Sequence, residues 1–325
     1  MDESFKISND ATLIEYRGNR RTFRIYREGD LLSEFSTWCT EGISQVTVPG
    51  DVVKHIDFKA FKNGVDLKEI ILGEGVISVE LGAFWGCDNL LDLWIGHSIR
   101  RFSVDALPVT DKKLTLHVNY ARGAWKAMKR AGFVLRNIPK DLWEAHSGLF
   151  LALKMANQKV VNLNLHVQRA EDIADNEFLG MPFDCTVTFH GDIRAKYLFQ
   201  RSMPSAVVIE KRVSYINPDA FLSRGEVYFD GTNIKCINVV AENTFFYSKE
   251  GVLFDGKSHI LIRFPQGKAD LLDGSYRIPA DTKTVAAGAF DGAYTIVNLV
   301  VPKGVVLAED ALANMPKLEL VCMEE

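Results

Sequence analysis

Apolar residues recur along this chain with a period of 23 residues. Between residues 43 and 112, four series of small or apolar residues advance in step. The series are Val53, Val76 and Ile99; Ile56, Val79 and Phe102; Ala60, Ala83 and Ala106; and Phe61, Phe84 and Leu107. Four series in step predict three copies of one unit, in which a short strand and a turn lead to a returning segment with an Ala-Phe pair.

The same spacing returns nearer the C-terminus. Residues 209–221 repeat the internal offsets of residues 72–84, and two further copies cover residues 278–290 and 301–312. Weaker copies occupy residues 163–178, 187–199 and 227–241, which makes roughly nine units in all. A unit this small cannot bury its apolar face alone, so neighbouring copies must stack. The pattern predicts a mainly β repeat solenoid with a parallel sheet.

Alternation within the strands predicts which side chains point outward. Each strand shows two apolar residues flanking one residue of the opposite face. The predicted outward residues form a candidate binding face: Thr47, Ile71, Trp94, Val208, Tyr228, Arg277 and Val300. Some of these residues suit a strand simply because they are β-branched. Trp94 beside Ile71, however, predicts a contiguous apolar patch that either binds a partner or is covered by another segment of the chain.

Two stretches of sequence resemble the bacterial BspA-type leucine-rich repeats. The stretches are LKEIILGEGVISVELGAFWGCDNL, residues 67–90, and YRIPADTKTVAAGAFDGAYTIVNLVVPKGV, residues 276–305. Units of that family carry an isoleucine-proline after the strand and an alanine-phenylalanine-x-glycine-cysteine turn, and Cys87 falls on the cysteine of that turn. The resemblance implies a leucine-rich-repeat solenoid and a protein-binding or adhesion function on the bacterial surface or outside the cell.

Two helical patterns interrupt the repeats. Apolar residues at helical spacing cover residues 119–133, and a second helical pattern follows Pro139. We therefore predict an N-terminal array with an opening hairpin at residues 1–118, a helical joint at 119–158 and a C-terminal array at 159–325. Residues at about 245–265 resemble the hairpin that the family inserts between coils.

Charge and hydropathy narrow the choice of partners. The 325 residues include 38 Lys and Arg against 42 Asp and Glu, a net charge of −4, which disfavours nucleic acid and anionic membrane surfaces. No apolar run approaches the roughly 18 residues of a membrane span, and the start, MDESFKISND, lacks the order of a signal peptide. The chain itself therefore indicates a soluble, cytoplasmic protein, whereas the resemblance implies secretion or the cell surface.

The sequence contains no recognisable catalytic or metal-binding motif. Its five cysteines are far apart, which predicts buried free thiols, and His117, His166 and His190 follow strand patterns as strand-end residues. Nucleophile-elbow, phosphate-loop and H-E-x-x-H motifs are missing. The sequence predicts a protein that is not an enzyme and uses no cofactor or metal.

One basic segment supports a different function. Five arginines are interleaved with aromatic residues near the N-terminus: Arg17, Arg20, Arg21, Arg24 and Arg27. Such a mixture can bind phosphates and stack on bases, but arginine also keeps the edge of a sheet soluble. The leading hypothesis is a non-enzymatic recognition scaffold for a protein partner. The alternative is an intracellular regulatory or nucleic-acid-contacting module that uses the Arg17–Arg27 hairpin.

Overall fold

The computed structural model describes the chain in segments separated by gaps. Described are short stretches within residues 5–56, and residues 60–96, 98–99, 101–103, 106–108, 114–120, 161–173, 185–199, 204–222 and 234–324. The chain divides into two compact units. Unit 1 comprises residues 1–165 and 181–183, and unit 2 comprises residues 166–180 and 184–325.

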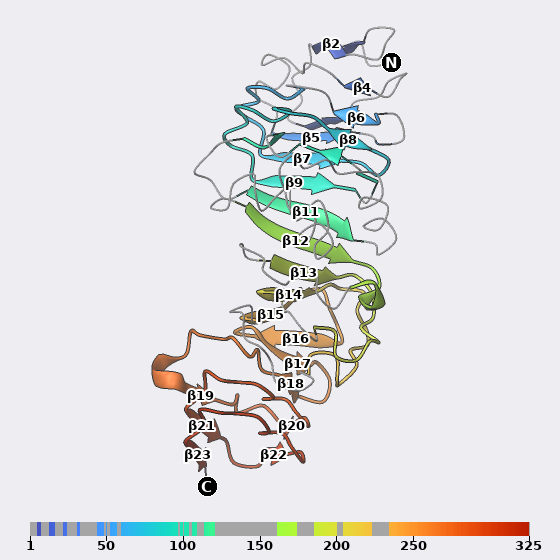
Figure 1. The fold of residues 1–325 in the computed structure, drawn as a ribbon. Helices are drawn as coiled ribbons and strands as arrows, with labels where there is room; N and C mark the ends of the chain where they lie inside the picture. The colour runs from blue at the N-terminus through green and yellow to red at the C-terminus, as the bar shows by residue number, and fades with distance from the viewer. Residues whose placement is uncertain are drawn as a thin grey trace, which may run out of the picture. The chain divides into compact units, whose positions relative to one another are not determined.

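Unit 1 is built of parallel strands that follow one another in chain order (Figure 1). One sheet contains β3 (Thr22–Arg24), β5 (Gln45–Val48), β7 (Glu69–Leu72), β9 (Asp92–Ile95) and β11 (Leu114–Tyr120). A second contains β4 (Leu31–Leu32), β6 (His55–Ile56), β8 (Ser78–Val79) and β10 (Arg101–Phe102). A hairpin of β1 (Phe5–Ile7) and β2 (Leu13–Tyr16) precedes them.

The core of unit 1 follows the 23-residue period. All twelve residues of the four repeating series are buried. Successive coils are joined in the returning segments, where the amide of Phe61 donates to the carbonyl of Ala83 at 2.8 Å and that of Phe84 to Ala106 at 2.9 Å. The rings of Phe61 and Phe84 stack with centroids 5.7 Å apart. Residues one period apart in the sequence therefore stack on each other in the core.

Unit 2 combines parallel strands with a hairpin. Its first parallel strands are β13 (Cys185–Phe189), β14 (Ala206–Ile209) and β15 (Cys236–Val239). Next come the antiparallel strands β16 (Phe246–Lys249), β17 (Val252–Asp255) and β18 (Ile260–Arg263). The hairpin β16–β17 lies in the range where the sequence places an inserted hairpin.

Two separate sheets complete unit 2. One continues from β18 through β20 (Thr284–Val285) to β22 (Val306–Leu307), and the other contains β19 (Ser275–Arg277), β21 (Asn298–Val301) and β23 (Leu320–Met323). β12 (Val161–Val167) lies where the two units meet in the sequence. The described residues include two named 3₁₀ turns, η2 (Ala170–Asp172) and η3 (Leu272–Gly274).

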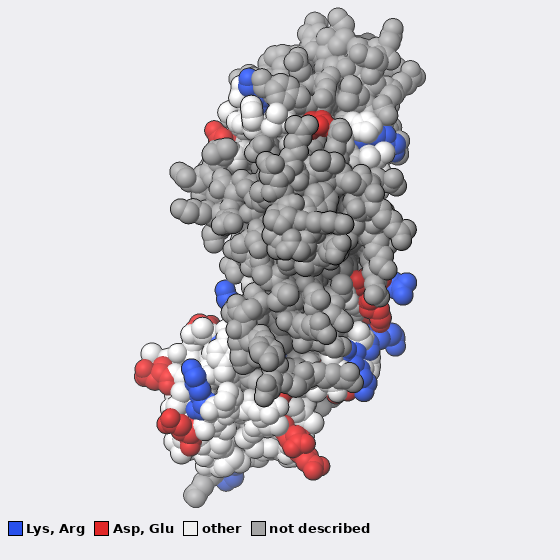
Figure 2. Space-filling view, in the orientation of Figure 1, with Lys and Arg blue, Asp and Glu red and all other residues white. Residues whose placement is uncertain are grey.

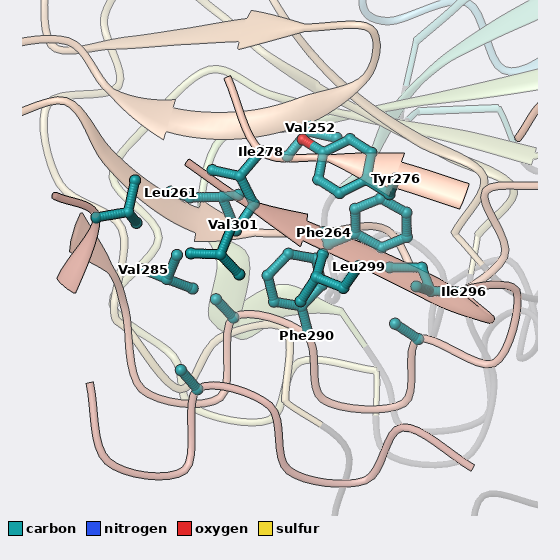
Figure 3. Packing of buried hydrophobic residues seen from close by; sticks show 14 of the residues in the cluster. Val252, Leu261, Phe264, Tyr276, Ile278, Val285, Phe290, Ile296, Leu299 and Val301 are labelled. Atoms are coloured by element: carbon teal, nitrogen blue, oxygen red, sulfur yellow. The ribbon is translucent and has the colours of Figure 1, made fainter. Parts of the chain in front are cut away.

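A cluster of apolar side chains forms the core at the C-terminal end of unit 2 (Figure 3). The Phe264 ring stacks on Phe290 with centroids 5.4 Å apart and meets Tyr276 edge-on at 4.8 Å. Beside this cluster, the buried Arg263 guanidinium donates to the carbonyls of Gly288 at 2.6 Å and Asp291 at 2.9 Å. Burial lowers the pKa of Arg263 to about 10, so the side chain stays charged at neutral pH, and it joins β18 to the returning segment of residues 288–291.

The repeat solenoid predicted from the sequence is confirmed, but several details differ. Val285 pairs in register with Leu307, which follows it by 22 residues, one fewer than the 23-residue period of the N-terminal repeats. His117 and His166 lie inside strands, since β11 and β12 are longer than predicted. β11 also includes Asn119 and Tyr120, which the sequence assigned to a helix. The rest of the predicted helical joint, residues 121–158, lies outside the described residues.

Candidate binding face

Three of the predicted outward residues lie in one row across adjacent strands of unit 1. Thr47 pairs in register with Ile71, and Ile71 with Trp94. The row continues to His117 on β11, which pairs with Trp94. All four side chains are half-buried, whereas the flanking residues on each strand, such as Leu93 and Ile95 around Trp94, are buried. We call Thr47, Ile71, Trp94 and His117 the outer row.

Trp94 and His117 form the centre of the outer row. Their rings stack with centroids 4.0 Å apart and planes inclined by 10°. The indole Nε1–H of Trp94 donates to Oε1 of Glu69 at 2.9 Å, and Nε2 of His117 lies 2.9 Å from Oδ1 of Asp92. Each ring is therefore attached by a polar bond to a carboxylate on a neighbouring strand. This arrangement orients two flat rings beside each other.

A second row of polar side chains runs parallel to the outer row. Gln45, Glu69, Asp92 and Thr115 pair in register across β5, β7, β9 and β11. The amide nitrogen of Gln45 donates to Oε2 of Glu69, so this carboxylate accepts hydrogen bonds from two strands. The second row places two carboxylates next to the aromatic pair. The face can therefore offer stacking surface and hydrogen-bond acceptors together.

Of the five arginines in the predicted basic segment, the structure describes Arg24. Arg24 lies on β3, where its backbone pairs in register with Thr47, so it occupies the position next to the outer row. Arg17, Arg20, Arg21 and Arg27 lie outside the described residues. The register places Arg24 of the basic segment beside the candidate face.

The predicted outward residues of unit 2 fall on two different sheets. Val208 is half-buried on β14 and pairs with Thr188 and with Asn238. Arg277 on β19 and Val300 on β21 are partners in the separate three-stranded sheet. The Arg277 guanidinium is paired with the carboxylate of Glu324.

Tyr228 and its predicted strand lie outside the described residues. The strand that follows β14 in its sheet is β15, so Asn238 is the register partner of Val208 on that side. Acidic and basic side chains are interspersed over the described surface near the C-terminus in the view of Figure 2. The predicted face is therefore contiguous in unit 1 and divided in unit 2.

His117 is the site residue that sequence reasoning missed. It follows Trp94 by 23 residues, so the repeat itself carries the signal. Because His117 was interpreted as a strand-end residue, it was not included in the predicted binding face. The carboxylate partners Glu69 and Asp92 also share this spacing, because they lie 23 residues apart.

The described residues provide few features of catalytic or metal sites. No group of three or more His, Cys, Asp or Glu in the described part of the chain could hold a metal ion. Among the described cysteines, Cys87, Cys236 and Cys322 are free thiols. Cys87 is buried, its thiol donates to the carbonyl of Phe61 at 3.0 Å, and burial raises its pKa to about 12. A thiol with this pKa is a packing group, because a nucleophile must be a thiolate.

The comparisons with known proteins agree with the resemblance seen in the sequence. Residues 33–111 match the BspA type leucine rich repeat region in six copies, and this part of the chain consists of repeats of that type. No curated protein matches the chain. No helix among the described residues is long and apolar enough to cross a membrane.

Several solved structures of bacterial leucine-rich repeat proteins are similar to the chain at low identity. A leucine rich cell surface protein from Faecalibacterium prausnitzii is 15% identical, with 99% of this chain and 75% of that chain covered and a TM-score of 0.34. The pneumococcal vaccine antigen PcpA is 16% identical, with 98% and 70% covered and a TM-score of 0.27. A leucine-rich repeat protein from Bacteroides ovatus is 11% identical, with 99% and 98% covered and a TM-score of 0.29.

Proposed function

We propose that this protein is a non-enzymatic scaffold of the adhesion type that binds a protein partner at the bacterial surface or outside the cell. The BspA-type repeats of residues 33–111 support this function, because leucine-rich repeats of this kind generally serve in binding. The outer row lies mainly in the same segment. Repeat stacking brings side chains from successive coils into one extended face, which suits recognition of another protein.

The observation that carries the proposal is the stacked pair of Trp94 and His117. Its rings are half-buried and fixed by Glu69 and Asp92, so little side-chain freedom remains to be lost on binding. Aromatic side chains held in this way are typical of the residues that dominate protein interfaces. The adjacent carboxylates favour a partner that presents basic or hydrogen-bond-donating groups.

The direct test measures binding of the full chain to a panel of purified extracellular and cell-surface proteins by biolayer interferometry. We expect at least one member to bind, and Trp94→Ala to weaken its binding at least about tenfold. Glu69→Gln should weaken binding less, because the glutamine Oε1 can still accept the hydrogen bond from Trp94.

Leu91→Ala is the matched control. Leu91 is exposed in the same unit, directly before β9, and is not part of the outer row. Thermal unfolding of each variant separates a lost contact from a lost fold. Binding by no member of the panel, or equal binding by Trp94→Ala and the parent chain, would contradict the proposal.

The nucleic-acid alternative stays a prediction. It rests on the basic segment, of which the structure describes Arg24 at the register position beside Thr47. A fluorescent single-stranded oligonucleotide is the appropriate probe. Binding that falls steeply with salt and is abolished by Arg20→Ala with Arg21→Ala would favour the alternative over the protein-binding function.

A further inference from the structure

Two carboxylates lie along one side of the stacked pair of Trp94 and His117. Glu69 and Asp92 are register partners on the adjacent strands β7 and β9 (Figure 1). Oε1 of Glu69 accepts the hydrogen bond from the indole nitrogen of Trp94. Oδ1 of Asp92 lies 2.9 Å from Nε2 of His117. Each ring of the aromatic pair is therefore in direct contact with a carboxylate.

Glu74 brings a further carboxylate to the opposite side of the aromatic pair. Gly96 and Asn119 lie two residues after Trp94 and His117, so they belong to the same face of the sheet. Oε1 of Glu74 accepts a hydrogen bond from Nδ2 of Asn119 at 2.8 Å. A Cβ at Gly96 would meet Oε2 of Glu74 at 2.7 Å, so the glycine leaves room for this carboxylate. The aromatic pair thus lies between carboxylates.

The negative charge beside the aromatic pair lacks a strong cation among the described residues. Glu69 receives its hydrogen bonds from Gln45 and Trp94, which are neutral donors. Asp92 contacts His117, and no described Lys or Arg forms an ion pair with Glu69 or Asp92. Charge complementarity therefore favours a partner that brings a cationic group to this face.

Asp92 is the carboxylate best placed to meet such a group. Its side chain is 43% exposed, whereas that of His117 is 13% exposed. Oδ1 of Asp92 faces His117, and Oδ2 has no hydrogen bond to another described residue. A carboxylate has about four acceptor positions on its two oxygens, so Asp92 can accept hydrogen bonds from a partner while it still contacts His117.

Arginine is the cationic side chain that matches both the rings and the carboxylates. Its guanidinium is planar, so it stacks on an aromatic ring and donates to a carboxylate at the same time. The ammonium of lysine is a compact and strongly hydrated charge with no flat surface. A neutral ligand would leave the carboxylates uncompensated, and a phosphate or an acidic peptide would be repelled by them.

We propose that the outer row binds an arginine side chain of the protein partner. The guanidinium stacks on the pair of Trp94 and His117 and donates to Oδ2 of Asp92, while Glu69 and Glu74 add to the attraction. This inference rests on the proposed function, because it names the chemistry by which a protein partner is recognised at the same face.

The first test compares three fluorescein-labelled synthetic peptides in which serine alternates with arginine, lysine or citrulline. Fluorescence anisotropy follows their binding to the full chain at concentrations up to about 300 μM. We expect the arginine peptide to bind and the lysine peptide to bind at least about threefold more weakly. The citrulline peptide keeps the shape of arginine without its charge and should bind at least about tenfold more weakly.

The second test repeats the titration of the arginine peptide with variants of the chain. Asp92→Asn should weaken binding at least about tenfold, because the asparagine keeps a hydrogen-bonding group for His117 but loses the charge. Glu74→Gln should weaken it at least about twofold, since the glutamine can still accept the bond from Asn119. Asp88→Asn is the matched control, because Asp88 is exposed in the turn before β9 and lies outside both rows.

An arginine peptide that does not bind, or that binds no better than the citrulline peptide, would overturn the arginine site. So would equal weakening by Asp92→Asn and Asp88→Asn, since that result would indicate a diffuse effect of net charge. Circular dichroism should show that these variants are folded, because the substituted side chains are partly or fully exposed.

The results also distinguish the arginine site from the proposed function. A panel protein whose binding Trp94→Ala weakens but Asp92→Asn leaves unchanged would overturn the arginine site and support the protein-binding function. Binding of the arginine peptide that depends on Asp92, without binding of any panel protein, would support the arginine site and contradict the protein-binding function.

Discussion

At the scale of single residues, position in the stack decides how much each apolar side chain contributes. Phe84 is fully buried, and its ring stacks on Phe61 of the preceding coil. Leu312 occupies the corresponding ring position in the last coil and is only half-buried. A residue with coils on both sides loses more contact on truncation than one at an end.

Phe84→Ala should lower the free energy of unfolding by roughly 3–5 kcal/mol, because it leaves a cavity in the middle of the stack. Leu312→Ala should cost less than about 2 kcal/mol, since its side chain remains partly in contact with water. Urea denaturation of the two variants beside the parent chain measures both effects. Equal, near-zero changes would show that the Ala-Phe pairs do not form a core ladder.

Cys87 should be inert in the folded protein. Burial raises the pKa of its thiol to about 12, so almost none is thiolate at about pH 8. Iodoacetamide should therefore label the exposed Cys322 of the native chain and leave Cys87 unmodified. After denaturation, intact mass should show five alkylated cysteines, and a mass two hydrogens lower per pair would reveal a disulfide instead.

At the scale of elements, side chains on neighbouring strands determine local stability. In unit 2, His166 on β12 and His190, which follows β13, approach each other with Nδ1 and Nε2 2.9 Å apart. One of these nitrogens must be unprotonated to accept the hydrogen bond. Burial lowers the pKa of His190; Glu210 opposes this shift and Arg212 adds to it.

The stability of unit 2 should consequently fall as the pH drops. Because the pKa of His190 is lower in the folded than in the unfolded state, the unfolded chain takes up the proton first. The stability that neutral His190 contributes is complete above the ordinary histidine pKa of about 6.5. It is lost as the pH falls through the lower pKa that His190 has in the folded state. Thermal unfolding measured at several pH values should show that the melting temperature falls less with decreasing pH for His190→Asn than for the parent chain.

His259→Asn is the control for this experiment. His259 lies 3.8 Å from Asp281 and is not part of the His166–His190 pair, so its replacement tests whether the effect belongs to that pair. A parent chain whose stability does not fall with pH, or an effect removed equally by both substitutions, would contradict the role assigned to His190.

At the scale of the whole molecule, we expect a substitution to change stability mainly near its own site, because the chain divides into two compact units. Each coil of a repeat array contacts mainly its neighbours, so a perturbation spreads along the stack and weakens with distance. Phe290 belongs to the core cluster of unit 2, whereas Phe84 belongs to unit 1. Damage to either core should therefore remain largely in its own unit.

Phe290→Ala tests this locality by hydrogen–deuterium exchange. Amides of residues 260–311 should exchange faster, because the ring stack with Phe264 is lost. Amides of residues 69–95 in unit 1 should exchange at the rate of the parent chain. Faster exchange throughout both units would mean that the chain unfolds as one cooperative body.

The sequence by itself determined the repeating unit, the buried residues of residues 53–107 and the register of Thr47, Ile71 and Trp94 in one row. In a stack of parallel coils, residues one period apart become neighbours, so Phe61 and Phe84, or Ile71 and Trp94, could be paired from spacing alone. Where the 23-residue period holds, the spacing of residues in the sequence therefore predicts which side chains are in contact.

The tertiary structure decided what the period does not encode. Which carboxylate meets Trp94 or His117 depends on side-chain reach across strands, and the burial of Arg263 depends on the carbonyls of Gly288 and Asp291. The separate sheet of β19, β21 and β23 and the pairing of β14 with β15 also appear only in three dimensions. Where the spacing between strands departs from the period, backbone hydrogen bonds along the whole coil decide which strands pair. The alternation of apolar and polar residues within one strand does not predict that choice.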